Sequence, residues 1–431
     1  MRKLLSTFWL VGLASIVSGC DSKSTSPPEI TPTKSALARV TDPQVSEADQ
    51  ATLATDNTSF ALDAYHKLTA EHANLVFSPA SVSIALSMAY AGAVGTTASE
   101  MAAALRFSLP AERLYPAFDA LDLNLASRGQ GKLGTDGGPM QVNIVNAAWA
   151  EKTYTFKTEY LDILAANFGA GINPMDFINQ WEAARITIND WVADQTNDRI
   201  QNLLPDGSLD SLTRLVLTNA VYLNAAWKEP FDSKDSNDGS FALLGGSSVT
   251  TKFMHTHLAA APALQGTGFS AVALPYDDDR LSMLLLVPDA GTFDAFEASL
   301  DAAKLNSIVS GLVTQAVSLG MPRFRTETDQ DFVAILASLG MHAAFQSGQA
   351  DFSGMDGTHR LYISQVLHKA FIDVGEKGTE AAAATAVVMS AGMAMPTGIS
   401  IYADHPFIYV VLDEPTGAIL FMGRVLDPSK T

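Results

Sequence analysis

Hydrophobic positions follow two periods along this chain, and each period predicts a different kind of element. Apolar side chains recur at helical spacing at Phe60, Leu62, Ala64, Tyr65 and Leu68. Further on, a strand is expected to end at Ser78 and Pro79. The apolar helix that follows it is stopped by Gly92 and Gly95, and a new helix opens near Thr96. The pattern predicts a mixed helix and strand domain that begins near residue 58.

The stretch from Glu376 to Thr385 fits both periods. It follows a strand-like run and contains four consecutive alanines. Alanine is the best helix former, so residue types alone favour a helix capped by Thr379. In a strand, small uncharged side chains would share one face, at Thr379, Ala381, Ala383 and Thr385. The other face would hold Glu380, Ala382 and Ala384, where one charge can stay in water.

Composition limits the function classes. The 431 residues are 47% hydrophobic and 17% charged, as in a globular protein with a large core. The formal charge of −19 repels phosphate backbones, so we expect neither nucleic-acid binding nor a polyanionic cofactor.

The N-terminus resembles a bacterial lipoprotein signal. Arg2 and Lys3 precede an apolar run from Leu4 to Val17, and the only cysteine, Cys20, follows small residues. We expect residues 1–19 to be removed and Cys20 to be lipidated, which predicts a lipid-anchored protein of the bacterial cell envelope, periplasmic or on the surface. An ordinary secretory signal with a chance cysteine is the alternative.

The segment after Cys20 is rich in Ser, Thr, Pro and Ala. This composition predicts a flexible tether over residues 20–57 and a single domain over residues 58–431. With no cysteine after Cys20, disulfides and thiol catalysis are excluded for the folded part.

Two short motifs carry little weight. Gly129, Gly131 and Gly134 match a dinucleotide fingerprint, but no strand precedes them and no helix can follow. His255 and His257 share a strand face without a third ligand nearby. We find no catalytic motif either, and we expect neither a metal, a cofactor nor an enzyme activity.

Ordered motifs run over about residues 55–428. They include Asn74 to Glu100, Asn189-Asp-Trp191, Leu217-Thr-Asn219, Met321-Pro-Arg-Phe324, Val366 to Ala370, Asp404-His-Pro-Phe407 and Phe421-Met-Gly-Arg-Val425. Together these motifs resemble the serpin family of serine protease inhibitors. The resemblance implies an α+β serpin fold: three β-sheets with a large central sheet, eight or nine helices and an exposed reactive loop from about Gly378 to Met395. The protein is expected to be monomeric.

The resemblance also implies a suicide-substrate mechanism. A serine protease attacks the reactive loop and forms an acyl-enzyme. The cleaved loop then enters the large sheet as a new strand and traps the protease. The hinge that enters first is Glu376, Gly378, Thr379, Glu380, Ala381, Ala382, Ala383, Ala384 and Thr385. With this resemblance, the strand reading of the stretch replaces the helix reading.

Further positions are implied by motif. Ser78, Ser81, Asn189 and His368 resemble the polar cluster beneath the centre of the large sheet; ordinary core polar residues are the alternative reading. Glu376 and Arg323 resemble an acid–base pair at the end of the sheet where insertion starts, beside Trp227. Arg323 could form a bidentate bond.

The family spacing from Glu376 places the cleaved bond between Gly392 and Met393. Met389, Ala391 and Met395 are alternatives, because glycine anchors a specificity pocket poorly. The small apolar surroundings suit elastase-like, subtilisin-like or chymotrypsin-like proteases. A non-inhibitory serpin that acts as a binding or chaperone-like protein is the alternative function.

Overall fold

The computed structural model describes residues 30–135, 137–380 and 398–430. Within these ranges the helices are α1 (Glu47–Leu68), α2 (Pro79–Tyr90), α3 (Gly95–Ala104), α4 (Ala111–Ala126), α5 (Thr158–Phe168), α6 (Phe177–Gln195), α7 (Phe293–Ala298), α8 (Ala302–Gly311), α9 (Phe332–Ser338), α10 (Ser353–Asp356) and the 3₁₀ turn Ala343–Phe345.

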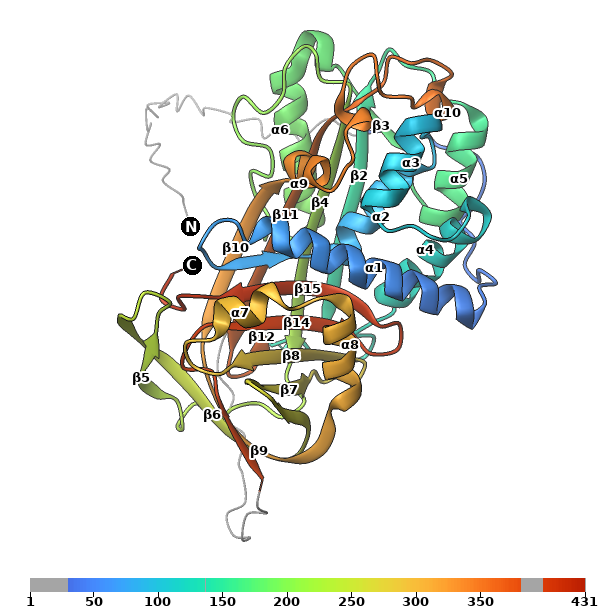
Figure 1. The fold of residues 1–431 in the computed structure, drawn as a ribbon. Coiled ribbons are helices and arrows are strands. Elements are labelled where there is room, and N and C mark those ends of the chain that lie inside the picture. The colour runs from blue at the N-terminus through green and yellow to red at the C-terminus, as the bar shows by residue number, and fades with distance from the viewer. Residues whose placement is uncertain (1–29, 136, 381–397, 431) are drawn as a thin grey trace, which may run out of the picture.

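The strands of the same ranges form two hydrogen-bonded sheets (Figure 1). They are β1 (Leu75–Phe77), β2 (Gln141–Glu151), β3 (Ile172–Met175), β4 (Leu215–Ala226), β5 (Asn237–Ala242), β6 (Ser248–Gly266), β7 (Phe269–Pro275), β8 (Leu281–Pro288), β9 (Val313–Pro322), β10 (Phe324–Asp331), β11 (Ile363–Gly375), β12 (Gly378–Thr379), β13 (Ile399–Tyr402), β14 (Phe407–Asp413) and β15 (Ala418–Val425).

The large sheet has the strand order β10-β11-β12-β4-β2-β3, and β11 also pairs directly with β4. The nine-stranded sheet follows β1-β15-β14-β8-β7-β6-β9-β13, with β5 on β6. The long strand β6 pairs with β5 over residues 248–253 and with β7 over residues 263–266, and its register with β9 shifts between Leu258 and Ala261. The expected mixed fold is present, but its two smaller sheets occur as one hydrogen-bonded sheet that is continuous through β6.

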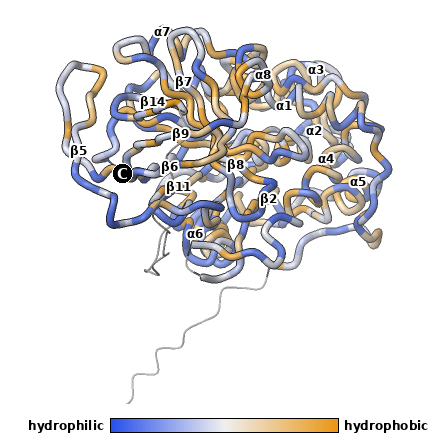
Figure 2. The backbone as a smooth tube through the Cα atoms, turned by 90° about the horizontal axis from the view of Figure 1, so that it is seen from below, coloured by the Kyte–Doolittle hydropathy of each residue, from blue (hydrophilic) through white to orange (hydrophobic). Residues whose placement is uncertain are grey.

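Helix α2 shows how the sequence defines an element locally. The hydroxyl of Ser78 accepts from the backbone N–H of Ser81 at 3.4 Å, and Pro79 occupies the first turn. Nearly every residue of the helix is buried, so it lies in the core and not at its edge. Figure 2 shows hydrophilic stretches along much of the periphery, for example near β5. None of the described helices combines the length and apolarity that a membrane span needs.

The expectation of a flexible tether over residues 20–57 is wrong for its described part. Helix α1 begins at Glu47, capped by Ser46, so the folded region starts before residue 58. Earlier still, the backbone N–H of Thr33 donates to the Ile172 carbonyl at 2.8 Å, at the β3 edge of the large sheet. Arg39 Nε lies 2.8 Å from a carboxylate oxygen of Asp119, whose side chain is fully buried. The segment before α1 is therefore held by contacts with residues distant in sequence, although its composition is typical of a flexible tether.

Candidate functional site

The hinge begins inside the large sheet. Strand β12 lies between β11 and β4, with Thr379 opposite Val374 on one side and Ala225 on the other. Farther along, β11 and β4 pair directly in parallel, from Ile363 to Phe371 on β11. The sheet is therefore parted by β12 at one end and paired beyond it. The helix reading of this stretch is wrong for Gly378 and Thr379.

Position 378 requires a glycine because the backbone of β4 lies too close to it for any side chain. Its φ is +149°, and a Cβ added there would lie 2.0 Å from the Ala225 carbonyl oxygen and 2.8 Å from Thr135 Cγ2. No side chain fits between these atoms without moving the backbone of β4. Gly378 is thus held tightly between β4 and the loop that carries Thr135.

The side chain of Thr379, the next residue, points into the core. Its hydroxyl oxygen lies 2.6 Å from the hydroxyl oxygen of Tyr276, and both residues are buried. The Tyr276 ring stacks on Trp227, with 4.5 Å between ring centroids. Burial raises the pKa of Tyr276, so this hydroxyl stays protonated and able to hydrogen-bond. The small polar side chain that the sequence places here therefore has a specific buried partner.

Trp227 holds the backbone just before the hinge. Its indole N–H donates to the Gly375 carbonyl at 2.9 Å, and its backbone N–H donates to the Lys377 carbonyl at 2.7 Å. The backbone N–H of Phe231 donates to the Glu376 carbonyl at 2.8 Å. Three donors thus fix the turn between β11 and β12.

Glu376 and Arg323 pair as the sequence predicts. Arg323 donates from Nε at 2.8 Å and also from Nη2, both to Glu376 Oε1, so the contact is not the bidentate bond to two oxygens that we expected. The hydroxyl of Ser236 donates to the same oxygen at 2.7 Å. Burial raises the pKa of Glu376, but the hydrogen bonds from Arg323 and Ser236 outweigh it, and the net pKa is lowered. The carboxylate therefore stays ionised at neutral pH.

A buried polar row crosses the centre of the large sheet. Asn219 on β4 lies opposite His368 on β11 and opposite Asn146 on β2. The Asn219 amide donates to Ser81 and Asn146, and its oxygen contacts His368 Nδ1. The backbone N–H of Ser78 donates to His368 Nε2 at 3.1 Å. His368 Nδ1 therefore carries the proton that Asn219 accepts.

Burial lowers the pKa of His368 to about 3. Within the row, its ring contacts the amide of Asn219 and the backbone of Ser78, so the neutral form is the one that the row accommodates. At neutral pH the centre of the sheet is therefore hydrogen-bonded but uncharged at this point.

The expectation that Asn189 joins this row is wrong. Asn189 lies on α6, where its amide donates to the Leu204 carbonyl at 2.9 Å and its oxygen accepts from the Leu204 N–H at 2.8 Å. It fastens α6 to the segment that follows the helix. Asn219 occupies the row instead. The sequence contains it in the run Leu217-Thr-Asn219, but only strand register places it opposite His368.

Glu380 does not leave its charge in water as expected. The residue is 8% exposed, and its Oε1 lies 2.6 Å from Nε of Arg199. The remaining hinge residues, Ala381 to Thr385, lie outside the described residues. The same holds for Cys20 and for the cleavage candidates Met389, Ala391, Gly392, Met393 and Met395.

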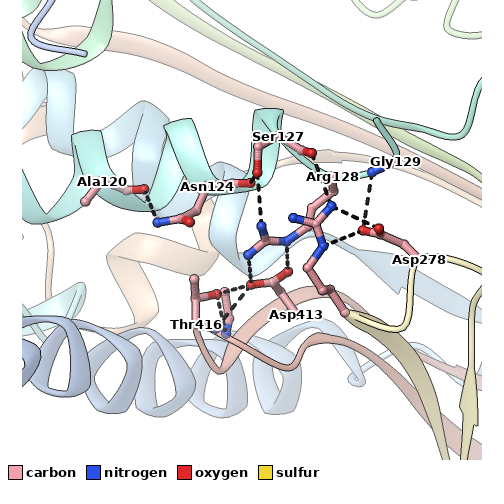
Figure 3. Close-up of polar contacts among 10 residues, drawn as sticks. Ala120, Asn124, Ser127, Arg128, Gly129, Asp278, Asp413 and Thr416 are labelled. Carbon is pink, nitrogen blue, oxygen red and sulfur yellow. Dashed lines mark hydrogen bonds and ion pairs between the residues drawn. The ribbon is translucent and has the colours of Figure 1, made fainter. Parts of the chain in front are cut away.

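The glycine-rich loop after α4 faces a carboxylate, which argues against phosphate binding there. The N–H of Gly129 donates to Asp278 at 3.3 Å, and Arg280 pairs with the same Asp278 (Figure 3). Next to them, Arg128 donates from two nitrogens to the buried carboxylate of Asp413. These contacts anchor the start of the loop that brings Thr135 to Gly378.

No metal centre is found in the part of the chain that the structure describes, since no group of three or more His, Cys, Asp or Glu residues comes together there. Of the two strand histidines singled out in the sequence, His257 contacts the hydroxyl of Ser318 at 2.9 Å.

Comparison with known proteins agrees with this geometry. Residues 55–428 match the family model described as Serpin (serine protease inhibitor). An uncharacterized serpin-like protein of Thermococcus kodakarensis is 38% identical over 373 residues, covering 86% of this chain and 84% of the relative. The human leukocyte elastase inhibitor is 34% identical over 386 residues, covering 87% of this chain and 99% of the relative.

Solved structures give the same result. Native tengpin, a thermophilic serpin, superposes with a TM-score of 0.80 at 25% identity, covering 92% of this chain and 97% of its own. Human thyroxine-binding globulin in complex with its hormone superposes with a TM-score of 0.79 at 28% identity, covering 88% and 99%. From its motifs, its parted large sheet and these matches, the chain belongs to the serpin family.

Proposed function

We propose that this protein inhibits serine proteases as a suicide substrate. The observation that carries the proposal is the position of β12, which already separates β11 from β4 at the hinge end of the large sheet. A loop cleaved beyond Thr379 has its first residues in register to continue as a strand. The relatives include an elastase inhibitor, which favours an inhibitory member of the family.

The covalent step follows acyl-transfer chemistry. The serine hydroxyl of the protease attacks the carbonyl carbon of Gly392, an ester forms, and the peptide bond to Met393 breaks. The serine proton goes by way of the protease base to the new amino group of Met393. Water would next hydrolyse the ester. Insertion of the loop as a strand must occur faster than that hydrolysis, because it then distorts the protease site and traps the ester.

Backbone hydrogen bonding favours insertion, and the entropy of ordering the loop opposes it. A strand of about ten residues adds two ladders of hydrogen bonds, each bond worth roughly 1 kcal/mol net. The gain is on the order of ten kcal/mol before the entropy of ordering is subtracted. An inward charge would slow the process, since burying an unpaired charge costs several kcal/mol. The hinge side chains after Glu380 are small and uncharged up to Thr385.

The test is to mix the protein with pancreatic elastase, subtilisin and chymotrypsin, and to look for an adduct that survives SDS. Mass spectrometry of the released fragment then identifies the cleaved bond, with Gly392–Met393 expected.

Ala383→Arg is expected to turn the inhibitor into a substrate, whereas Ser390→Ala is the matched control that keeps adduct formation. Cleavage without any adduct for all three proteases would contradict the proposal.

We also propose that the mature protein is held at the cell envelope by lipid on Cys20, since a basic start and an apolar run precede this cysteine. Cys20→Ser is expected to move the protein from the membrane fraction to the soluble fraction. Equal membrane association of both forms would contradict the anchor.

A non-inhibitory role is the second candidate function. Human thyroxine-binding globulin, a structural relative, was solved with its hormone bound, so members of this fold also serve as binding proteins. Differential scanning calorimetry before and after loop cleavage separates the two roles, because only a loop that inserts stabilises the cleaved protein.

A further inference from the structure

The chain leaves the large sheet at one residue. The backbone N–H of Glu380 donates to the Asp373 carbonyl at 2.5 Å, which continues the ladder with β11. Glu380 itself has a φ of +67°, in the left-handed region, whereas Thr379 before it lies in strand β12. A non-glycine residue in this region is strained by roughly 1 kcal/mol or more. The exit turn at Glu380 is therefore a conformation that its surroundings must hold.

An ion pair holds this turn. The Glu380 carboxylate is largely buried, and its Oε1 lies 2.6 Å from Nε of Arg199. Arg199 follows α6, and its side chain is 48% exposed, so it can move without unpacking the core. A largely buried carboxylate is more stable beside a cation than without one, so the pair favours the conformation in which it forms.

Three consecutive hinge residues, Gly378, Thr379 and Glu380, are each contacted from a different segment. Gly378 packs against Thr135, Thr379 hydrogen-bonds Tyr276 on the core side, and Glu380 pairs with Arg199. The first two contacts hold residues that are already in the sheet. The third contact holds the residue whose backbone must change from left-handed to extended before any later residue can enter.

We propose that Arg199 is a positioning residue of the inhibitory reaction, which holds the exit turn at Glu380 and so slows entry of the following residues into the large sheet. This inference rests on the proposed function. The pair is made in the starting conformation and is loosened as Glu380 becomes extended. Removing it therefore lowers the barrier to insertion, both for the cleaved loop and for the intact loop when no protease is present.

The test uses full-length protein and four variants: Arg199→Gln, Glu380→Gln, the double variant, and Arg199→Lys, which keeps the charge. The control is Arg113→Gln, which removes a pair of similar exposure between α4 and the largely buried Asp49 on α1. Each protein is incubated without protease at raised temperature. Urea-gradient gels then follow its conversion to a form that resists unfolding, as expected for a sheet that has taken up the loop.

Each neutral single variant is expected to convert about twofold to fivefold faster, the range for losing a half-exposed ion pair. The double variant is expected to convert no faster than either single variant, because both remove one interaction. Arg199→Lys and Arg113→Gln are expected to stay close to the original rate. Unchanged or slower conversion, or effects that multiply in the double variant, would overturn the proposal.

A second readout separates this inference from the proposed function. The number of inhibitor molecules consumed per protease is expected to fall in Arg199→Gln, because faster insertion competes better with hydrolysis of the ester. If no protease yields an adduct, inhibition is refuted, but the conversion rates without protease still decide whether Arg199 holds the turn. A residue that merely stabilises the fold would lower the unfolding midpoint without changing the conversion rate.

Discussion

Two pairs of adjacent strands, β8–β14 and β4–β11, are both buried but differ in the polarity of their facing side chains. Between β8 and β14, facing residues such as Leu284 and Val410 are apolar and fully buried. Between β4 and β11, the facing pair at the centre is Asn219 and His368, also buried but hydrogen-bonded. Both contacts lie in the interior, so burial alone does not distinguish them.

The difference concerns what happens when strands separate. Interdigitated hydrocarbon loses its contacts and opens a void, which costs free energy over the whole surface. A polar row can exchange its partners for those of a new strand, because hydrogen bonds lost on one side can be formed on the other. The β4–β11 contact is also parted already by β12 at the hinge end. We infer that the large sheet can open there while the β8–β14 contact stays closed.

The largest expected effect is in the apolar contact. Leu285→Ala on the fully buried strand β8 removes buried methyl groups and leaves a cavity, which should cost about 3 kcal/mol of stability. Chemical denaturation measures this loss. The rate at which the protein converts, without protease, to the form that resists unfolding should change little by comparison. A loss below about 1 kcal/mol would mean that this contact relaxes as easily as the polar row.

Asn219→Ala should cause the next largest loss of stability. It leaves the Nδ1–H of His368 without its acceptor and takes a partner from Ser81, at a cost of about 2 kcal/mol. The control is Asn143→Ala on β2, since the Asn143 amide bonds only the exposed carbonyl of Gln195 among the described contacts. Similar losses of stability for both variants would contradict a special role for the central row.

The pH dependence probes the same row. The folded-state pKa of His368 is lowered to about 3 from 6.5, so the unfolded chain binds the extra proton first as pH falls. The stability that the neutral His368 side chain gives the fold is present above about pH 6.5, and it is lost progressively as the pH falls towards about 3. The slope is about 1.4 kcal/mol per pH unit. Between pH 7 and 5 the original protein should therefore lose about 2 kcal/mol more stability than His368→Gln. An equal loss in both proteins would rule out a buried neutral histidine.

The smallest effect is expected at the flank of the large sheet. Arg39→Gln removes the cation beside Asp119, whose carboxylate is fully buried. Burial raises the pKa of Asp119 and Arg39 opposes this, so the loss should be about 1 kcal/mol, measured as a lower unfolding midpoint. Arg106→Gln, which breaks an exposed pair with Asp63, is the control and should have almost no effect. Equal effects would show that residues 30–45 behave as the tether that composition predicts.

The sequence identifies motifs better than it identifies partners. The Arg323–Glu376 contact is found because family motifs contain both residues. Of the predicted hinge, the structure describes only the residues up to Glu380. The prediction that Asn189 lies in the central row is wrong, because its motif indicates its helix but not the strand register that brings Asn219 opposite His368. Arg39 and Arg199 could not be found from local pattern, since their partners Asp119 and Glu380 lie far away along the chain.

The central claim is that the large sheet accepts the loop as a new strand. The most direct measurement is the thermal unfolding midpoint of the protein before and after a single cut in the reactive loop. A net gain on the order of ten kcal/mol should raise the midpoint by roughly 10 °C, because the unfolding entropy of a domain this long is about 0.8 kcal/mol per kelvin. An unchanged or lower midpoint after the cut would contradict insertion, and with it the inhibitory mechanism.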